Sequence, residues 1–221
     1  MCGRYGFSDP DKLRERYELE NELKGLKPRY NVAPGQVMPV ITGNDKNHGQ
    51  LMRWGLVPSW AKGINIGYKM INARAERIHT KPSYGRLLRN HRCLVPATGF
   101  YEWKKGEKNK IPFYIKLKND AIFSFAGLFD IWNDKQGSEL KTYTVITTNP
   151  NPMLATIHDR MPVILNKKNE TIWLDYQVSD LSRILGLLTP IDEKSWEAYP
   201  VSDNVNKPTN DSSDLIKKLN K

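Results

Sequence analysis

The sequence predicts an α+β fold, a single domain built on a largely antiparallel, barrel-like β-sheet with peripheral helices. Many short runs of β-branched and aromatic residues are separated by Gly, Asn and Pro, and few regular helical patterns lie between them. A doubly wound parallel sheet needs a crossover helix between successive strands, so this pattern disfavours it. With 221 residues the chain is long enough to bury one large core.

Strands are predicted where such runs are bounded by turn-forming residues. These runs are Val37–Thr42, Gln50–Val57, Arg92–Val95, Phe100–Trp103, Pro112–Leu117, Ile122–Ile131, Thr142–Thr147 and Pro162–Leu165, after a short extended lead-in at residues 1–7. Helical patterns are found at Ser83–Arg89, Pro152–Ile157, Glu170–Leu174 and Asp180–Leu187. An earlier helix, to about residue 20, is expected after Ser8-Asp9-Pro10, because a capping side chain followed by proline favours a helix start.

The domain is expected to span residues 1–201, since no linker or internal repeat divides them. Residues 21–36 contain Pro28, Pro34 and Gly35 and are predicted to be loop. Residues 202–221 are polar, and a segment with few apolar side chains gains little from burial to offset the entropy lost on ordering. We therefore predict a flexible C-terminal tail.

Charge favours an anionic partner. Lysine and arginine outnumber aspartate and glutamate by 34 to 24, which gives a formal net charge of +10. A surplus of this size is typical of proteins that bind nucleic acid or acidic membranes, although a solvated basic surface is an ordinary alternative.

The two cysteines, Cys2 and Cys93, are far apart in sequence and form no Cys-x-x-Cys pair, which argues against a zinc ribbon, a thioredoxin-type site or a disulfide scaffold. No metal site and no cofactor are expected. The first ten residues lack the apolar stretch of a signal peptide, and no run approaches a membrane span. We expect a cytoplasmic protein, nucleoid-associated if bacterial, with no membrane partner.

Cys2 carries the most chemical information, because loss of Met1 would leave its amine and thiol on neighbouring carbons. At pH 7 roughly one α-amine in seven is neutral, against about one lysine in 2,500. Such an amine attacks an aldehyde to form an imine, and the adjacent thiol can close on the imine carbon to give a thiazolidine. Cys2 could equally be an incidental residue beside the initiator methionine.

Two further segments combine polar groups with a structural alternative. If extended, the chain at Asn72 and Arg74 points an amide and a cation to one face, where Arg74 could grip a phosphate. Glu102 lies among aromatic residues, which would raise its pKa toward neutrality, and Trp103 beside it could stack on a base. Alternatively, Asn72 and Arg74 are loop residues and Glu102 faces solvent.

His158 follows a predicted helix and precedes a predicted strand. Its imidazole could transfer protons near pH 7, and Arg160 offers a second phosphate contact. A capping histidine is the alternative. Arg53, Trp54 and Trp60 interleave charge and aromatic rings as single-strand binding proteins do, but tryptophans are more often core. Cys93 lies in an apolar run and is expected to be a buried, inert thiol.

Together these segments resemble the SOS response-associated peptidase (SRAP) family of abasic-site-processing proteins, in the expected order over roughly residues 1–200. A cysteine at position 2 combined with three spaced motifs is a specific pattern. The matching pieces are Met1-Cys2-Gly3-Arg4, Tyr30-Asn31-Val32-Ala33-Pro34-Gly35, the Arg53–Trp60 segment, Asn72-Ala73-Arg74-Ala75-Glu76, Gly99-Phe100-Tyr101-Glu102-Trp103 and His158-Asp159-Arg160-Met161-Pro162.

The resemblance implies autocatalytic removal of Met1 and a thiazolidine crosslink from Cys2 to the ring-opened sugar of an abasic site in single-stranded DNA. The crosslink would shield the lesion during the SOS response, and an accompanying weak lyase activity is left open. The resemblance also implies a monomer. The implied catalytic residues are Cys2 (amine and thiol), Asn72 (positioning), Glu102 (proton transfer) and His158 (imine and ring chemistry); the implied DNA contacts are Arg4, Arg74 and Arg160 (phosphates) with Asn31, Pro34, Trp54 and Trp103 (groove or base stacking).

Two other functions stay open on the residues alone. Cys2, Glu102 and His158 could form a thiol peptidase site that cleaves other proteins with turnover. A module that binds single strands or modified bases without covalent attachment is the other possibility, and we rank it second, ahead of the peptidase.

Overall fold

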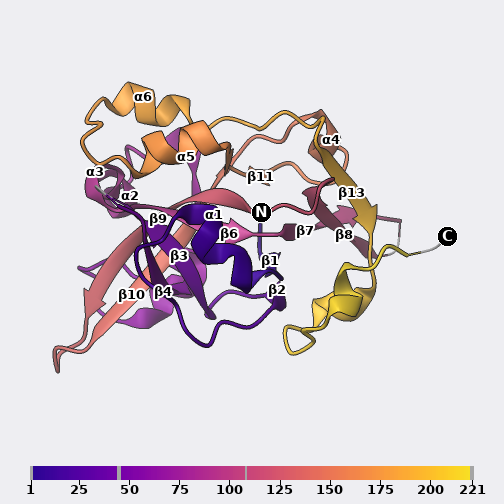
Figure 1. Cartoon of the computed structure of the whole chain (residues 1–221), viewed down its shortest axis with the longest axis horizontal. Helices are drawn as coiled ribbons and strands as arrows, with labels where there is room; N and C mark the ends of the chain where they lie inside the picture. The colour runs from indigo at the N-terminus through magenta and orange to yellow at the C-terminus, as the bar shows by residue number, and fades with distance from the viewer. Residues whose placement is uncertain (1, 44–45, 108, 220–221) are drawn as a thin grey trace.

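The computed structural model describes residues 2–43, 46–107 and 109–219 and contains a closed barrel (Figure 1). Its larger sheet runs in the order β11-β10-β4-β3-β6-β9-β12, and a further pairing between β10 and β9 joins the ring. The barrel strands are β3 (Val37–Thr42), β4 (His48–Trp54), β6 (Arg92–Ala97), β9 (Phe123–Asn133) and β10 (Glu139–Thr148). All pair antiparallel except β10 with β4.

Three short strands extend this sheet toward the candidate site. β11 (Met161–Pro162) and β12 (Ile164–Leu165) pair with β10 and β9, and β5 (Asn72–Arg74) runs parallel to β10. The β5 register joins Asn72 to Val145 and Arg74 to Thr147. Both motif residues are therefore fixed by the barrel and do not lie in a loose loop.

The second sheet has the order β13-β8-β7-β1-β2. Its strands are β1 (Arg4–Phe7), β2 (Arg29–Val32), β7 (Gly99–Lys105), β8 (Lys110–Leu117) and β13 (Trp196–Pro200). Only Thr98 separates β6 from β7, so one continuous stretch of chain links the barrel to this sheet. Gly99 is required at the crossing, because a Cβ there would lie 2.2 Å from the ring of Tyr114.

Six short helices are peripheral. They are α1 (Leu13–Tyr17), α2 (Pro82–Gly85), α3 (Leu87–Asn90), α4 (Pro152–Ala155), α5 (Lys167–Leu174) and α6 (Leu181–Gly186). Figure 1 shows α2, α3, α5 and α6 gathered at one end of the molecule. The predicted α+β class with a barrel-like, largely antiparallel sheet is confirmed.

Element boundaries differ from the sequence prediction at several places. Each predicted strand is present, although Pro162–Leu165 is divided into β11 and β12. β2 lies inside the segment predicted to be loop, and β13 was not predicted, because both are short and lack regular alternation. The first helix ends at Tyr17, since Glu18 adopts a left-handed conformation with φ of 51°.

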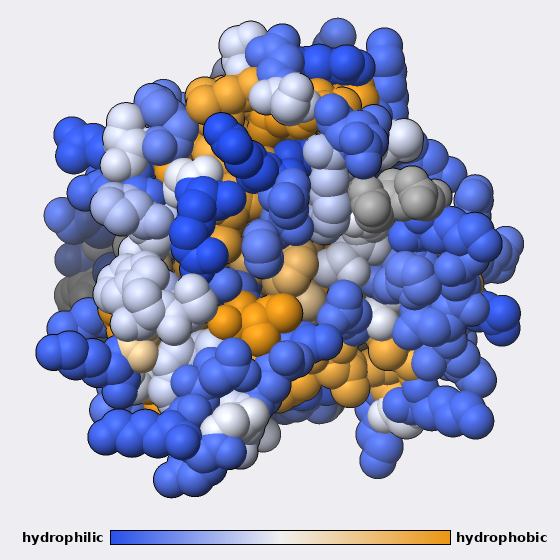
Figure 2. Space-filling model, turned by 90° about the vertical axis from the view of Figure 1, so that its left-hand side faces the viewer, coloured by the Kyte–Doolittle hydropathy of each residue, from blue (hydrophilic) through white to orange (hydrophobic). Residues whose placement is uncertain are grey.

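The apolar core joins the two sheets through aromatic contacts. The ring of Tyr5 in β1 packs edge-on against Trp54 and Phe125, with centroids 5.2 and 5.8 Å apart. Its hydroxyl hydrogen-bonds that of Tyr143 at 2.7 Å, so a buried polar group is satisfied inside the core. On the face shown in Figure 2, hydrophilic side chains surround smaller apolar patches.

Arg92 is a buried cation that fastens two helix ends to the barrel. Its Nε donates to the carbonyl of Trp173 (2.6 Å), and its two Nη atoms donate to the carbonyls of Leu88, Arg89 and Asp175. These carbonyls lie at the C-terminal ends of α3 and α5, where the helix dipole is negative. Backbone dipoles thus hold this charge without a carboxylate partner among the described residues.

The expectation of a flexible C-terminal tail is wrong for its described part, residues 202–219. Val205 and Leu215 are buried in a second apolar cluster against the β7–β8–β13 side of the small sheet. The carboxylate of Asp211 accepts hydrogen bonds from the backbone N–H groups of Tyr30 (2.6 Å) and Asn31 (3.0 Å). Two apolar anchors and one capping carboxylate order a segment whose average composition is polar.

Truncation of an anchor should therefore destabilise the whole domain. Leu215→Ala is expected to lower the free energy of unfolding by about 2–4 kcal/mol, because it leaves a cavity in a packed cluster. Leu219→Ala is the matched control, since Leu219 is 47% exposed, and should change stability by less than about 0.5 kcal/mol. Urea unfolding followed by tryptophan fluorescence measures both. Equal stability of the two variants would show that the segment contributes nothing to folding.

Candidate active site

Strand pairing brings the start of the chain to Glu102. β1 pairs antiparallel with β7, with Arg4 opposite Tyr101 and Tyr5 opposite Phe100. Going back along β1 from Arg4 therefore leads toward Glu102, and the buried thiol of Cys2 is within electrostatic range of that carboxylate. Burial raises the pKa of the Cys2 thiol, and the charge of Glu102 adds to the effect. Met1 lies outside the described residues.

Glu102 is a buried carboxyl group. Its residue is 2% exposed, and burial raises its pKa from the ordinary range to about 7. At neutral pH both protonation states are populated, which is the condition under which a carboxyl group can both accept and donate protons. The alternative in which Glu102 faces solvent is excluded.

His158 faces Glu102, with Nε2 at 3.8 Å from its Oε2. Nδ1 of His158 accepts a hydrogen bond from the backbone N–H of Arg160 at 3.0 Å. The carboxylate of Asp159 is also 2.9 Å from Nδ1, but it is largely exposed to water, so we assign the backbone amide as the partner. The neutral ring then carries its proton on Nε2, directed toward Glu102. Burial lowers the pKa of His158, which favours this neutral form.

Asn72 fixes the backbone of Cys2. Its Nδ2 donates to the Cys2 carbonyl at 2.8 Å, and the backbone carbonyl of Asn72 accepts a hydrogen bond from the hydroxyl of Tyr84. The Oδ1 atom of Asn72 is buried and has no hydrogen-bond partner in the described part of the chain. A buried acceptor without a donor is costly. It is therefore available to a donor that arrives at this place.

A polar pocket of about 740 Å³ opens beside these groups. It is lined by Glu102, Trp103, Asn109, Lys110, His158, Asp203 and Asn206. Its volume suits a sugar with attached phosphates. The sequence analysis did not identify Lys110, nor Asn206, which lies in the predicted tail. The only signal for Lys110 was its proximity in sequence to the Glu102 motif.

Arg4 and Arg74 remain available to an anion. The Nη1 of Arg4 donates to Asn31 Oδ1 (2.8 Å) and to the Val205 carbonyl (2.7 Å), both neutral acceptors. Arg74 is exposed, and its side chain makes no hydrogen bond within the described part of the chain. Neither guanidinium has a carboxylate partner among the residues described, so both could attract phosphate.

Arg160 is different, because its guanidinium is already occupied. Nη1 and Nη2 form a bidentate pair with Glu76 at 2.7 and 3.0 Å, and Nη2 also donates to the Thr147 carbonyl at 2.7 Å. The side chain is 11% exposed. A direct phosphate contact by Arg160 therefore does not fit this conformation. The residue instead ties the His158 loop to β10, because it bonds both.

Two predicted base or groove contacts are also incorrect. Trp54 is 1% exposed, and its Nε1 donates to the Ile71 carbonyl, so it is a core residue that cannot stack on a base. Asn31 is buried and directs its amide to the backbone of residues 205–210. Trp103 and Pro34 are half-buried at the surface, and Trp60 is 57% exposed. Of the two tryptophans in the Arg53–Trp60 segment, Trp54 is thus core and Trp60 is accessible.

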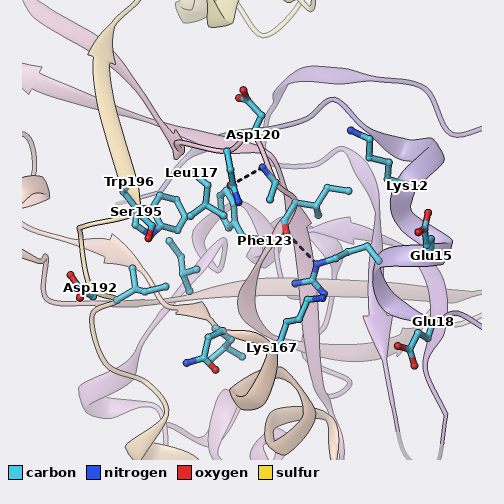
Figure 3. A pocket seen from close by; sticks show the side chains of 18 residues that line it. Lys12, Glu15, Glu18, Leu117, Asp120, Phe123, Lys167, Asp192, Ser195 and Trp196 are labelled. Atoms are coloured by element: carbon cyan, nitrogen blue, oxygen red, sulfur yellow. Dashed lines mark hydrogen bonds between the residues drawn. The ribbon is translucent and has the colours of Figure 1, made fainter.

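Another pocket, of about 830 Å³, lies elsewhere. Figure 3 shows that Lys12, Glu15 and Glu18 line one side and Asp192, Ser195 and Trp196 the other. None of the sequence-predicted site residues lines it, and its acidic and basic groups are mixed.

Among the residues that the structure describes, no group of three or more His, Cys, Asp or Glu side chains could hold a metal ion. Within the same residues, the helices are too short and polar to cross a bilayer. Cys93 is buried, and burial raises its pKa.

A known family model matches most of the chain. The family model described as SOS response associated peptidase (SRAP) matches residues 1–208. The chain belongs to this family.

Relatives of this SRAP chain cover nearly its whole length. It is 47% identical to the abasic site processing protein YoqW of Bacillus subtilis, over 98% of this chain and 99% of that protein. It is 31% identical to the abasic site processing protein HMCES of Xenopus tropicalis, over 98% of this chain and 78% of that one. A crystal structure from Bacteroides thetaiotaomicron superposes with a TM-score of 0.90 at 32% identity, covering 99% and 100% of the two chains.

The raised pKa of Glu102 in this SRAP chain makes stability depend on pH. An unfolded glutamate titrates near 4.3, so the folded state binds more protons up to about pH 7, and the stability supplied by protonated Glu102 is lost as pH rises through that value. Glu102→Gln does not titrate. Its free energy of unfolding should match wild type near pH 4 and exceed it by roughly 3 kcal/mol at pH 8. Urea unfolding across this pH range tests it, and a difference independent of pH would contradict the raised pKa.

Proposed function

We propose that this chain processes abasic sites by covalent capture, with Cys2 attached to the ring-opened sugar of an abasic site in single-stranded DNA. The observation that carries the proposal is the placement of a residue-2 thiol against a carboxyl group with a pKa of about 7, with His158 beyond it. The names of the relatives, as abasic site processing proteins, support the same substrate.

The first step on this proposal is removal of Met1, which frees the α-amine of Cys2. Water adds to the Met1 carbonyl while Glu102 takes one of its protons, and Glu102 then gives that proton to the departing Cys2 amine, so that Met1 leaves as the free amino acid. Both protonation states of Glu102 are populated near pH 7. Asn72 holds the Cys2 carbonyl, so the residue stays in place while its amide bond to Met1 is cleaved. The freed α-amine would belong to the residue whose carbonyl Asn72 already binds, and the Oδ1 of Asn72 has no hydrogen-bond partner among the described residues.

Capture of the sugar then takes two steps. The amine adds to the sugar aldehyde and loses water to form an imine, and the thiol adds across that imine, with sulfur bonding to carbon and the thiol proton passing to nitrogen. Because burial keeps the thiol protonated, the second step needs a proton carrier. Glu102 is the nearest such group on electrostatic grounds, and neutral His158 can donate through Nε2 to assist ring opening or reversal.

Cationic and aromatic groups would hold the DNA around the lesion. Arg4 and Arg74 offer guanidinium groups that pair with no carboxylate in the described part of the chain, and Lys110 lines the pocket. Trp60 is exposed on a loop fastened by hydrogen bonds from Ser59 N to Asp130 and from Trp132 Nε1 to the Ala61 carbonyl. A rigidly held, exposed indole suits stacking on an unpaired base.

The cysteine test uses intact mass spectrometry of the purified chain, alone and after incubation with single-stranded DNA carrying one abasic site. Wild type should lack Met1 and form a heat-stable adduct, which Cys2→Ala should not form. Cys93→Ala is the matched control and should form the adduct normally, since Cys93 is buried in the core. Absence of an adduct in wild type that lacks Met1 would refute the proposal. Peptide cleavage with turnover would instead favour a peptidase.

Loss of the Trp60 ring should weaken DNA binding before any covalent step. On the Cys2→Ala background, Trp60→Ala is expected to reduce affinity for abasic single strands by roughly 5- to 150-fold, the equivalent of 1–3 kcal/mol for one stacked base. Trp60→Phe, which keeps an aromatic face, should recover much of this loss. Fluorescence anisotropy at fixed salt measures both. Identical affinities for Ala and Phe would exclude stacking at this position.

A further inference from the structure

Asn206 is one of the residues through which the C-terminal segment contacts the candidate site. Its side-chain Oδ1 accepts a hydrogen bond from Nε1 of Trp103 at 2.8 Å, and its backbone carbonyl accepts one from Nη2 of Arg4 at 3.2 Å. Trp103 is the neighbour of Glu102 in β7, and Arg4 is two residues from Cys2. Asn206 therefore touches both strands that bring Glu102 and Cys2 together, and it lines the same pocket as Glu102 and His158.

The surrounding segment, residues 203–211, is held to β2 by several hydrogen bonds. Figure 1 shows it beside β2, next to β1. The amide of Asn31 donates to the carbonyls of Val205 (3.1 Å), Lys207 (3.1 Å) and Asn210 (2.8 Å). Asp211 accepts hydrogen bonds from the backbone N–H groups of residues 30 and 31. These hydrogen bonds from β2 fix the position of residue 206 relative to β1.

The atoms that accept hydrogen bonds from the Arg4 guanidinium are all neutral. They are the Val205 and Asn206 carbonyls, together with Asn31 Oδ1. Burial lowers the pKa of Arg4, yet a guanidinium stays protonated across the physiological range. The segment therefore fixes the direction of this cation and leaves its charge uncompensated, which is the arrangement that favours an incoming phosphate.

We propose that Asn206 is a positioning residue for abasic-site capture, which orients the Trp103 indole and the Arg4 guanidinium as one unit beside Glu102. The inference rests on the proposed function, since the anion that Arg4 receives is a DNA phosphate and the indole borders the lesion. Asn206 is exposed, so it contributes little buried area to stability. Its hydrogen bonds act on the orientation of two neighbours that the reaction uses.

The experiment compares Asn206→Ala with Asn204→Ala; Asn204 is exposed, lies two residues earlier, and its side chain makes no hydrogen bond to the described residues. Asn206→Ala frees the indole and should lower the adduct-forming rate constant at saturating DNA several-fold, with an unchanged thermal midpoint. Asn204→Ala should match wild type. Asn206→Asp keeps the Trp103 acceptor and should retain the rate at saturation. Its added charge beside Arg4 should reduce the slope of log affinity against log salt by about 0.7, the value for one phosphate contact on a single strand.

Binding to single-stranded DNA with a tetrahydrofuran abasic analogue, measured on the Cys2→Ala background, separates the two proposals. If wild type forms no adduct, covalent capture fails, and the binding series still decides the role of Asn206. If wild type forms the adduct while Asn206→Ala and Asn204→Ala agree in rate, affinity and salt slope, the positioning role is overturned. A lower thermal midpoint in Asn206→Ala but not in Asn204→Ala, large enough to account for the lower rate constant through unfolded protein, would also overturn the positioning role in favour of a structural one.

Discussion

The pairing of β1 with β7 is the interaction on which the site depends. It sets Arg4 against Tyr101, and so leads the first residues of the chain to Glu102. A slip of one residue would turn every side chain of β1 to the opposite face and expose Tyr5, whose ring packs on the barrel aromatics. The apolar core thus enforces the register, and the register enforces the position of Cys2. Folding and chemistry are coupled through one short strand.

Low polarity around Glu102 determines the protonation states of the site. Burial raises the pKa values of the carboxyl group and of the Cys2 thiol, and it lowers that of His158. Each group is shifted toward its neutral form, as expected where water is scarce. Arg4 keeps a full charge held by neutral carbonyls, so the strongest field nearby attracts an anion. Among the described residues, Arg4 has no carboxylate ion-pair partner.

The sequence predicted those features that depend on local pattern. The α+β class follows from strand-forming runs, and Cys2, Asn72, Glu102 and His158 lie in recognisable motifs whose side chains the structure brings into one neighbourhood. Pattern alone could not find partners distant in sequence. Glu76 occupies Arg160, the barrel encloses Trp54, and residues 205–211 bond Asn31, so each of these motif residues has a role its own segment does not reveal. Asn206 and the order of the C-terminal segment escaped prediction for the same reason.

Arg92 joins parts of the molecule far from the reaction. Its guanidinium donates to carbonyls at the ends of α3 and α5 and lies over the rings of Trp173 and Tyr176, while its own backbone belongs to β6 of the barrel. Neither helix can detach without leaving a desolvated charge unsatisfied, a cost of several kcal/mol. The helical end and the barrel are thereby made into one cooperative unit.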